Sequence, residues 1–167
     1  MTRGLFIGRF QPFHNGHEYA LKLILEECDE VIVAIGSAQK NFTLDNPLTC
    51  GERIDMLWRY FKRRKILDRT IICAIPDINN NFIWPRHVLS LAPKFDIVYS
   101  GNELVLLLFQ QAGIPVKRIV EINKEHLSGT VIRQLILENK EWRHLVPSIV
   151  ASFLDEIGFE ERLRSLA

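Results

Sequence analysis

Residues 4–17 have the sequence GLFIGRFQPFHNGH, and this stretch decides the expected fold. Its first five residues form a short apolar run, which predicts a buried strand. Helical periodicity begins at His17 and continues to Glu27, with one apolar face. Between the strand and the helix lies a turn that contains His14. The segment therefore predicts a strand, a turn and a helix that begins near two histidines.

The alternation of short apolar runs and longer helical segments continues along the whole chain. Further strands are expected at 30–36, 70–75, 95–99 and 116–122. Further helices are expected after the capping-box pattern Thr49–Glu52, at Trp84-Pro85, after 100–102, at 128–130 and from Pro147 to about Glu156, followed by a short tail.

This order of elements defines the expected fold class. Continuous apolar strands suit a parallel sheet that is covered on both faces. We therefore expect an α/β protein, with a doubly wound Rossmann-like parallel sheet of about five strands and helices on both faces. Residues 1–140 are expected to form this domain, and residues 141–167 a short C-terminal helical extension of it.

The composition is that of an ordinary globular chain. The 167 residues are 47% hydrophobic and 25% charged, and the net charge of +1 gives no reason to expect a nucleic-acid or membrane partner. The basic run at 62–65 (KRRK) is explained as a solvated helix end. Three widely spaced cysteines and the lack of a signal peptide or long apolar span indicate free thiols in a cytoplasmic protein.

The histidine pair carries the strongest chemical signal. Gly16, between His14 and His17, lets a ligand approach the backbone closely. The helix N-terminus supplies unpaired N–H groups and partial positive charge, and imidazoles there can donate hydrogen bonds to phosphoryl oxygens. The arrangement suits a polyphosphate. The alternatives are two structural histidines or a metal site, although no cluster of Cys, Asp or Glu supplies further ligands.

A second phosphate-binding candidate lies at residues 128–133, SGTVIR. Ser128 and Thr130 offer hydroxyls and amides at a helix N-terminus, and Arg133 can reach phosphate from the first turn. The simpler alternative is an ordinary Ser/Thr cap beside a solvated arginine. Residues 10–17 resemble the signature of the nucleotidylyltransferase superfamily with the HxGH motif, and residues 128–133 resemble its second motif, (S/T)-x-T-x-x-R.

Further segments narrow this resemblance to the archaeal-type nicotinamide-mononucleotide adenylyltransferases. They are residues 8–14 (GRFQPFH), 36–39 (GSAQ), 47–53 (PLTCGER) and 99–102 (YSGN). The resemblance spans essentially the whole chain. It implies an enzyme of NAD synthesis that joins ATP to nicotinamide mononucleotide, giving NAD and pyrophosphate by direct in-line attack on the α-phosphate. It also implies Mg²⁺ carried with ATP and a homo-oligomer such as a hexamer.

The resemblance assigns roles to particular residues. The expected catalytic residues are His14, His17, Arg9 and Arg133; the expected ATP-binding residues are Gly8, Phe10, Gly16, Ser128 and Thr130; the expected mononucleotide-binding residues are Ser37, Asn81 and Trp84. Trp84 can stack on the pyridinium ring, and Asn81 can pair with the carboxamide. A core tryptophan and a solvated loop are the alternatives. No residue is expected to be a dedicated metal ligand, and Asp77 and Glu52 are the less favoured candidates.

The chain departs from the family pattern in the loop at 38–48. Some members have an arginine just before the proline, where this chain has Asp45-Asn46, and Lys40 is a candidate substitute. Phe42-Thr43 stands where relatives often have a histidine. Two other functions stay open: an adenylyltransferase for phosphopantetheine or flavin mononucleotide, and a non-catalytic module that senses ATP or NAD. The choice between nicotinamide and nicotinic-acid mononucleotide is open as well.

Overall fold

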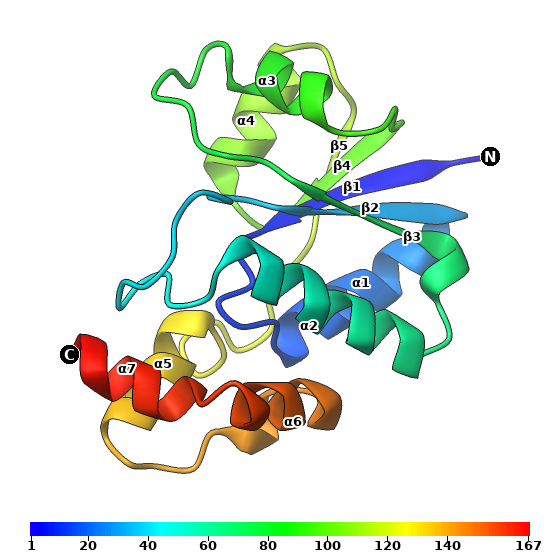
Figure 1. Ribbon diagram of the computed structural model, residues 1–167. Helices are drawn as coiled ribbons and strands as arrows, with labels where there is room; N and C mark the ends of the chain where they lie inside the picture. Colours follow the sequence, from blue (N-terminus) through cyan, green and yellow to red (C-terminus); the bar gives the residue numbers. More distant parts are fainter.

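A computed structural model describes residues 1–167 as a five-stranded parallel sheet with helices on both faces (Figure 1). The strands are β1 Arg3–Gly8, β2 Glu30–Ile35, β3 Thr70–Ala74, β4 Ile97–Ser100 and β5 Val116–Arg118. Their order in the sheet is β3-β2-β1-β4-β5, and every neighbouring pair is parallel. The chain winds outward from β1 to β3 and then returns to place β4 on the other side of β1. This confirms the doubly wound Rossmann-like fold.

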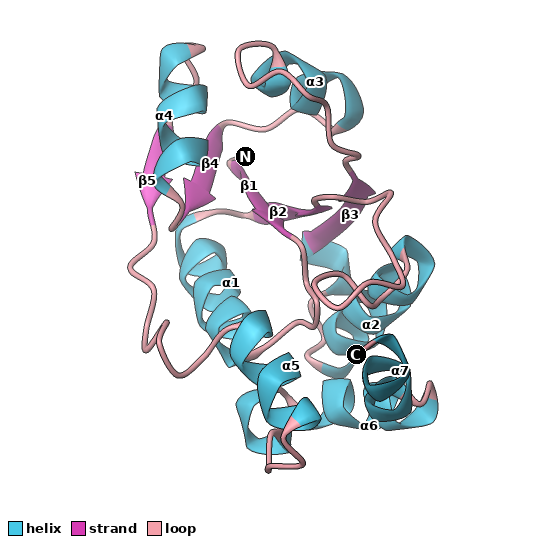
Figure 2. Cartoon of the chain, turned by 90° about the vertical axis from the view of Figure 1, so that its left-hand side faces the viewer, coloured by secondary structure: helices cyan, strands magenta, loops and turns pink.

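The helices divide between the two faces of the sheet. They are α1 Asn15–Glu27, α2 Cys50–Arg63, α3 Trp84–Leu91, α4 Glu103–Gln111, α5 Gly129–Leu137, α6 Ser148–Glu156 and α7 Phe159–Leu166, with short 3-10 turns η1 Leu67–Arg69 and η2 Arg143–Leu145. Figure 2 shows α3 and α4 on one side of the sheet and the other helices on the opposite side. None of the helices combines the length and apolar character needed to cross a membrane.

Each face of the sheet has its own hydrophobic core. A cluster of 7 buried residues, including Val88 of α3 and Phe109 of α4, fills one side. A cluster of 27 buried residues fills the other side, where α1 and α2 pack on the sheet and α5, α6 and α7 extend the same core. Trp142, which is 1% exposed, belongs to this larger cluster. The C-terminal helices therefore share the core of the sheet rather than enclosing one of their own.

The expected strand at 116–122 is wrong in its second half. β5 is the edge strand and pairs only with β4, up to the register pair of Ser100 with Arg118. β4 ends at Ser100, so residues beyond Ile119 have no neighbouring backbone to pair with, and the chain leaves the sheet. Val120 is 74% exposed, and the segment turns to line a pocket instead.

The tail expected after Glu156 is in fact a helix, α7. Gly158 has φ 69°, a left-handed conformation that ends α6 and turns the chain directly into the next helix. Phe159 and Leu163, one helical turn apart, are both buried in the larger core. The segment FEERLRSL has so few apolar residues that its periodicity is weak in the sequence. Its burial depends on the surface that α2, α5 and α6 provide.

We predict that Gly158→Ala lowers the free energy of unfolding by about 1 kcal/mol, because a left-handed conformation is strained for any residue with a Cβ. An added Cβ would meet no atom within 4 Å, so the cost comes from the backbone alone. Gly51→Ala, at an exposed position inside α2, is the matched control and should stabilise the protein by up to about 1 kcal/mol. Urea denaturation measures both; an unchanged or increased stability for Gly158→Ala would contradict the prediction.

Candidate active site

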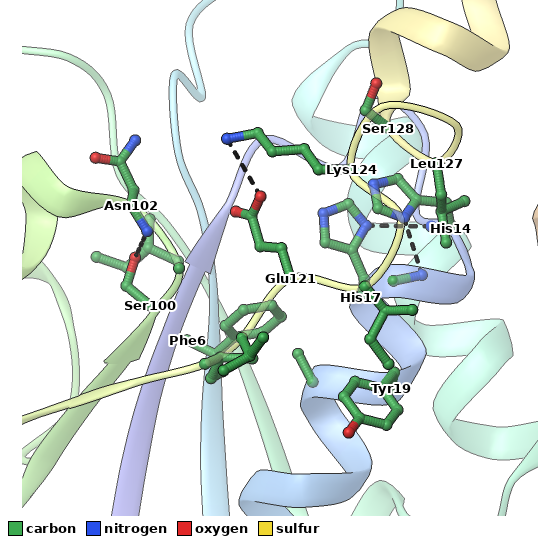
Figure 3. A pocket seen from close by; sticks show the side chains of 17 residues that line it. Phe6, His14, His17, Tyr19, Ser100, Asn102, Glu121, Lys124, Leu127 and Ser128 are labelled. Atoms are coloured by element: carbon green, nitrogen blue, oxygen red, sulfur yellow. Dashed lines mark hydrogen bonds and ion pairs between the residues drawn. The ribbon is translucent and has the colours of Figure 1, made fainter.

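Two pockets meet at the carboxyl ends of β1 and β4. The order of the sheet reverses between these strands, and open α/β sheets bind ligands at such a point. The first pocket, of about 210 Å³, lies between the start of α1 and the segment after β5 (Figure 3). The second, of about 440 Å³, lies beside the loops that follow β2 and β3. Ile7, Ser100 and Asn102 line both pockets, so the two pockets adjoin.

The two histidines of the first pocket cap α1 reciprocally. His14 is the N-cap, and its Nδ1 accepts a hydrogen bond from the Gly16 amide at 3.1 Å. His17 Nδ1 accepts from the His14 amide, also at 3.1 Å, and the two rings stack with centroids 3.7 Å apart. Because each Nδ1 is an acceptor, the neutral rings carry their proton on Nε2. Helix α1 therefore begins two residues before its predicted start, with imidazole nitrogens in place of the usual hydroxyl or carboxylate caps.

Burial keeps these imidazoles neutral. It lowers the pKa of His14 to about 4 and the pKa of His17 well below its usual value, with the neighbouring His14 adding to the second effect. Both rings line the pocket (Figure 3), and at neutral pH each is therefore an Nε2–H donor. Gly16 has a further role here, since a Cβ at this position would lie 2.9 Å from the His14 ring. The glycine makes room for the capping imidazole.

Arg133 is buried, not solvated. It is 6% exposed; its Nη1 donates to the Gln11 carbonyl at 2.7 Å and its Nη2 to Thr130 Oγ1 at 3.3 Å. Burial, and secondarily the positive charge of Arg9, lower the pKa of Arg133. The exposed Asp45 carboxylate, at 4.0 Å, is its nearest counter-charge. Two guanidinium groups with so little compensation form a cationic site that suits an anionic ligand.

The second pocket brings together the predicted mononucleotide residues. Ser37, Asn81 and Trp84 all line it, with Gly8 and Arg9. The Trp84 ring packs edge-on against the core residue Phe109, with centroids 5.4 Å apart, so it is both a partly buried core residue and a wall of the pocket.

The remaining predicted residues take supporting places. Ser128 caps α5 by accepting from the Val131 amide at 3.1 Å, and it also lines the first pocket. Thr130 is exposed and reaches the Arg133 guanidinium, whereas Phe10 is buried with its ring 4.8 Å from the His17 ring. Neither Thr130 nor Phe10 lines either of the two pockets.

Sequence reasoning missed two charged residues of the first pocket and named Asp77 only as a less favoured metal ligand. Asp77 lines the second pocket and accepts from Ser37 Oγ and Gln39 Nε2, both at 3.1 Å. Glu121 and Lys124 form an ion pair at 3.2 Å in the first pocket. Glu121 lay inside the strand expected at 116–122, so only the early end of β5 at Arg118 reveals that Glu121 and Lys124 lie at the edge where ligands bind.

Helix α7 holds the loop at 38–48. Arg162 donates to the Pro47 carbonyl at 3.0 Å and to both Glu52 oxygens at 2.7 and 2.8 Å, and it lies over the Phe42 ring at 4.5 Å. Glu52 also completes the capping box with Thr49, as predicted, and is thereby occupied away from the pockets. The same loop brings Asp45 near Arg133, whereas Lys40 lies 3.7 Å from Asp77.

The chain resembles known proteins over its whole length. The model of the cytidylyltransferase-like family matches residues 5–135, and the chain belongs to that family. Within it, the chain is similar to archaeal proteins named nicotinamide-nucleotide adenylyltransferase. The protein of Methanothrix thermoacetophila is 48% identical over 167 residues, and the match covers all of this chain and 97% of the relative. The protein of Pyrobaculum aerophilum is 48% identical over 169 residues, and the match covers all of this chain and 95% of the relative. The sequence resemblance is thereby confirmed.

A solved structure supports the fold independently. The bifunctional NMN adenylyltransferase/ADP ribose pyrophosphatase of Francisella tularensis superposes with a TM-score of 0.78 at 18% identity. The match covers 98% of this chain but only 52% of the Francisella chain. A second structure of that protein, complexed with AMP and a manganese ion, superposes with a TM-score of 0.74 at the same identity. At this identity the likeness shows the fold alone.

We predict that the protein loses stability as the pH falls from about 6.5 to about 4. Over this window the unfolded His14 ring binds a proton that the folded ring, with its pKa of about 4, does not bind. The difference amounts to roughly 1–3 kcal/mol for this residue. Urea denaturation at several pH values measures the slope. His14→Asn keeps a side-chain acceptor for the Gly16 amide and should flatten the slope, whereas His126→Asn, at an exposed position, should leave it unchanged. An unaltered slope in His14→Asn would rule out this source of pH dependence.

Proposed function

We propose that this chain transfers the adenylyl group of ATP to the phosphate of nicotinamide mononucleotide, giving NAD and pyrophosphate. The observation that carries the proposal is the pair of adjoining pockets that share Ile7, Ser100 and Asn102. Two nucleotides bound there would meet beside the neutral imidazole donors of His14 and His17 and near the guanidinium groups of Arg9 and Arg133. The full-length likeness to nicotinamide-nucleotide adenylyltransferases supports the same acceptor.

The two pockets suit different substrates. We assign ATP to the first pocket, with its phosphates near His14, His17 and the N-termini of α1 and α5. We assign nicotinamide mononucleotide to the second pocket, where Trp84 offers an aromatic surface to the pyridinium and Asn81 offers both a donor and an acceptor to the carboxamide.

The reaction needs alignment and charge stabilisation more than covalent help. A phosphate oxygen of the mononucleotide forms a bond to the α-phosphorus, the bond from that phosphorus to the bridging oxygen breaks, and pyrophosphate leaves with the electron pair. The Nε2–H groups of His14 and His17 are assigned to the oxygens on which negative charge develops. Arg9 and Arg133 are assigned to the triphosphate and the departing pyrophosphate.

We expect a divalent ion, Mg²⁺ in the cell, to enter with the ATP triphosphate. The side chains around the phosphate subsite are imidazoles, guanidiniums and hydroxyls, with the single carboxylate of Asp45 beside Arg133, and the chain holds no cluster of three or more potential ligands among His, Cys, Asp and Glu. Mg²⁺ usually keeps several waters and binds through substrate phosphates. A cytoplasmic homo-oligomer remains the expectation from the family resemblance.

The test is an acceptor panel. The purified protein is incubated with ATP, Mg²⁺ and nicotinamide mononucleotide, and NAD is followed with a coupled dehydrogenase. Parallel reactions with phosphopantetheine, flavin mononucleotide and nicotinic-acid mononucleotide are scored by pyrophosphate release. We expect rapid NAD formation and little release with phosphopantetheine or flavin mononucleotide. Release with one of these two instead would overturn the acceptor assignment, and ATP binding without any turnover would favour a nucleotide-sensing module.

We predict that His17→Ala lowers kcat about 10²–10³-fold, the usual effect of removing one donor that stabilises charge in a transition state. Helix α1 should persist, because His14 still caps it through the Gly16 amide. Circular dichroism checks the fold, and steady-state kinetics give kcat. His144→Ala is the matched control: its side chain is exposed, and only its backbone carbonyl is hydrogen-bonded to Asn15. Near-normal turnover of His17→Ala would remove His17 from the mechanism.

A further inference from the structure

Arg53 of α2 is completely buried and is a partner in none of the ion pairs of the structure. Its guanidinium donates only to backbone carbonyls. Nη1 donates to Arg9 and Gly36, both at 3.0 Å; Nη2 donates to Ser37, Ala38 and Lys40 at 3.2 to 3.3 Å; Nε donates to Thr49 at 3.3 Å. Placing a charge in the interior is costly unless it is well hydrogen-bonded, so these six carbonyls explain how the burial is tolerated.

Five of the six carbonyls belong to the loops that build the second pocket. Nη1 joins the residue after β1 to the residue after β2, two chain ends that are also linked by the Gly36 amide and the Gly8 carbonyl at 2.8 Å. Nη2 donates to three carbonyls of residues 37–40, so the loop curves around the guanidinium. Ser37 has φ 47° in this loop. This curve points the side chains of the loop toward Asp77, which accepts from Ser37 Oγ and Gln39.

These hydrogen bonds reach the lining of the second pocket and not that of the first. None of the residues whose carbonyls bind Arg53 lines the first pocket, whereas Arg9, Gly36 and Ser37 all line the second. The effect of Arg53 should therefore fall mainly on the acceptor side, and it reaches ATP only through the backbone of Arg9, whose guanidinium is assigned to the triphosphate. Its charge also has no carboxylate partner, so it adds to the positive field that Arg9 presents in the second pocket.

We propose that Arg53 is a positioning residue of the acceptor pocket, which holds the backbone at residue 9 and at residues 36–40 in the shape that receives the mononucleotide. It does this without touching the substrate. The proposal rests on the proposed function only for the identity of the acceptor, because the geometry of the pocket stands on the hydrogen bonds alone.

The test compares substrate affinities in Arg53→Gln and Arg53→Lys. In Arg53→Gln we expect the KM for nicotinamide mononucleotide to rise at least about tenfold, the effect of losing one or two hydrogen bonds from a charged donor. The Kd for ATP, from calorimetry, should change by less than about threefold. Lysine keeps the charge but has a single nitrogen and cannot reach both loops, so Arg53→Lys should give an intermediate rise. A general loss of folding would not produce this split between the two substrates.

Arg69→Gln is the matched control. Arg69 also donates to backbone carbonyls, those of Leu25, Cys28 and Asp29, but at the opposite end of the sheet. It should cost stability and leave both affinities unchanged. If Arg53→Gln does not fold, Arg53→Lys carries the test with a smaller split. Equal effects on both substrates, no effect, or the same split in Arg69→Gln would overturn the proposal.

The same measurements separate this proposal from the proposed function. Calorimetric titration of nicotinamide mononucleotide into the wild-type protein measures the affinity of the acceptor pocket even without turnover. Binding without NAD formation would sink the proposed reaction and leave the Arg53 comparison intact, with Kd in place of KM. A wild-type protein that neither binds nor converts the mononucleotide would overturn both. Normal NAD formation with no split in the variants would overturn the role of Arg53 alone.

Discussion

The central position of β1 is the constraint on which the rest of the structure depends. A buried parallel strand must have partners on both sides, and β1 pairs with β2 along six residues and with β4 along three. The helices that connect these strands leave on opposite faces of the sheet, so the carboxyl end of β1 stays uncovered. The residues that follow Gly8 therefore emerge at the only edge where both substrates could meet, and the two pockets form on either side of them.

In the site, the histidines supply oriented hydrogen-bond donors and the arginines supply positive charge. The histidines are neutral donors with a defined tautomer, fixed by the amides that they cap. The arginines bring positive charge, and Arg133 is anchored by the Gln11 carbonyl and the Thr130 hydroxyl, with the Asp45 carboxylate no nearer than 4.0 Å. Such anchoring leaves the charge available to a phosphate, which a salt bridge would have neutralised. In the proposed site a polyphosphate would thus meet a preorganised surface, and little reorganisation would be needed at the moment of reaction.

Local sequence signals predicted the parts of this structure that depend on local physics. The β-branched run of β2 and the capping box of Thr49 and Glu52 are such parts, and His14 and His17 were found from their spacing at a helix start. The errors arose where a distant segment decides the outcome. β5 ends because its neighbour ends, and α7 folds because other helices offer it a surface. Arg53 looks like an ordinary helical arginine in sequence, since its six carbonyl partners come from loops that only the fold brings together.

Because of helix α7, the two chain ends differ in their distance from the pockets, which matters for attaching a tag. Met1 is 89% exposed and precedes the amino end of β1, opposite the pockets. Ala167 directly follows the helix whose Arg162 donates to the Pro47 carbonyl and lies over the Phe42 ring, so this end of the chain lies close to the loop at 38–48. A purification tag or surface-immobilisation handle therefore belongs at the N-terminus, because bulk attached to the C-terminus would disturb the helix that contacts the loop at 38–48 beside the proposed site.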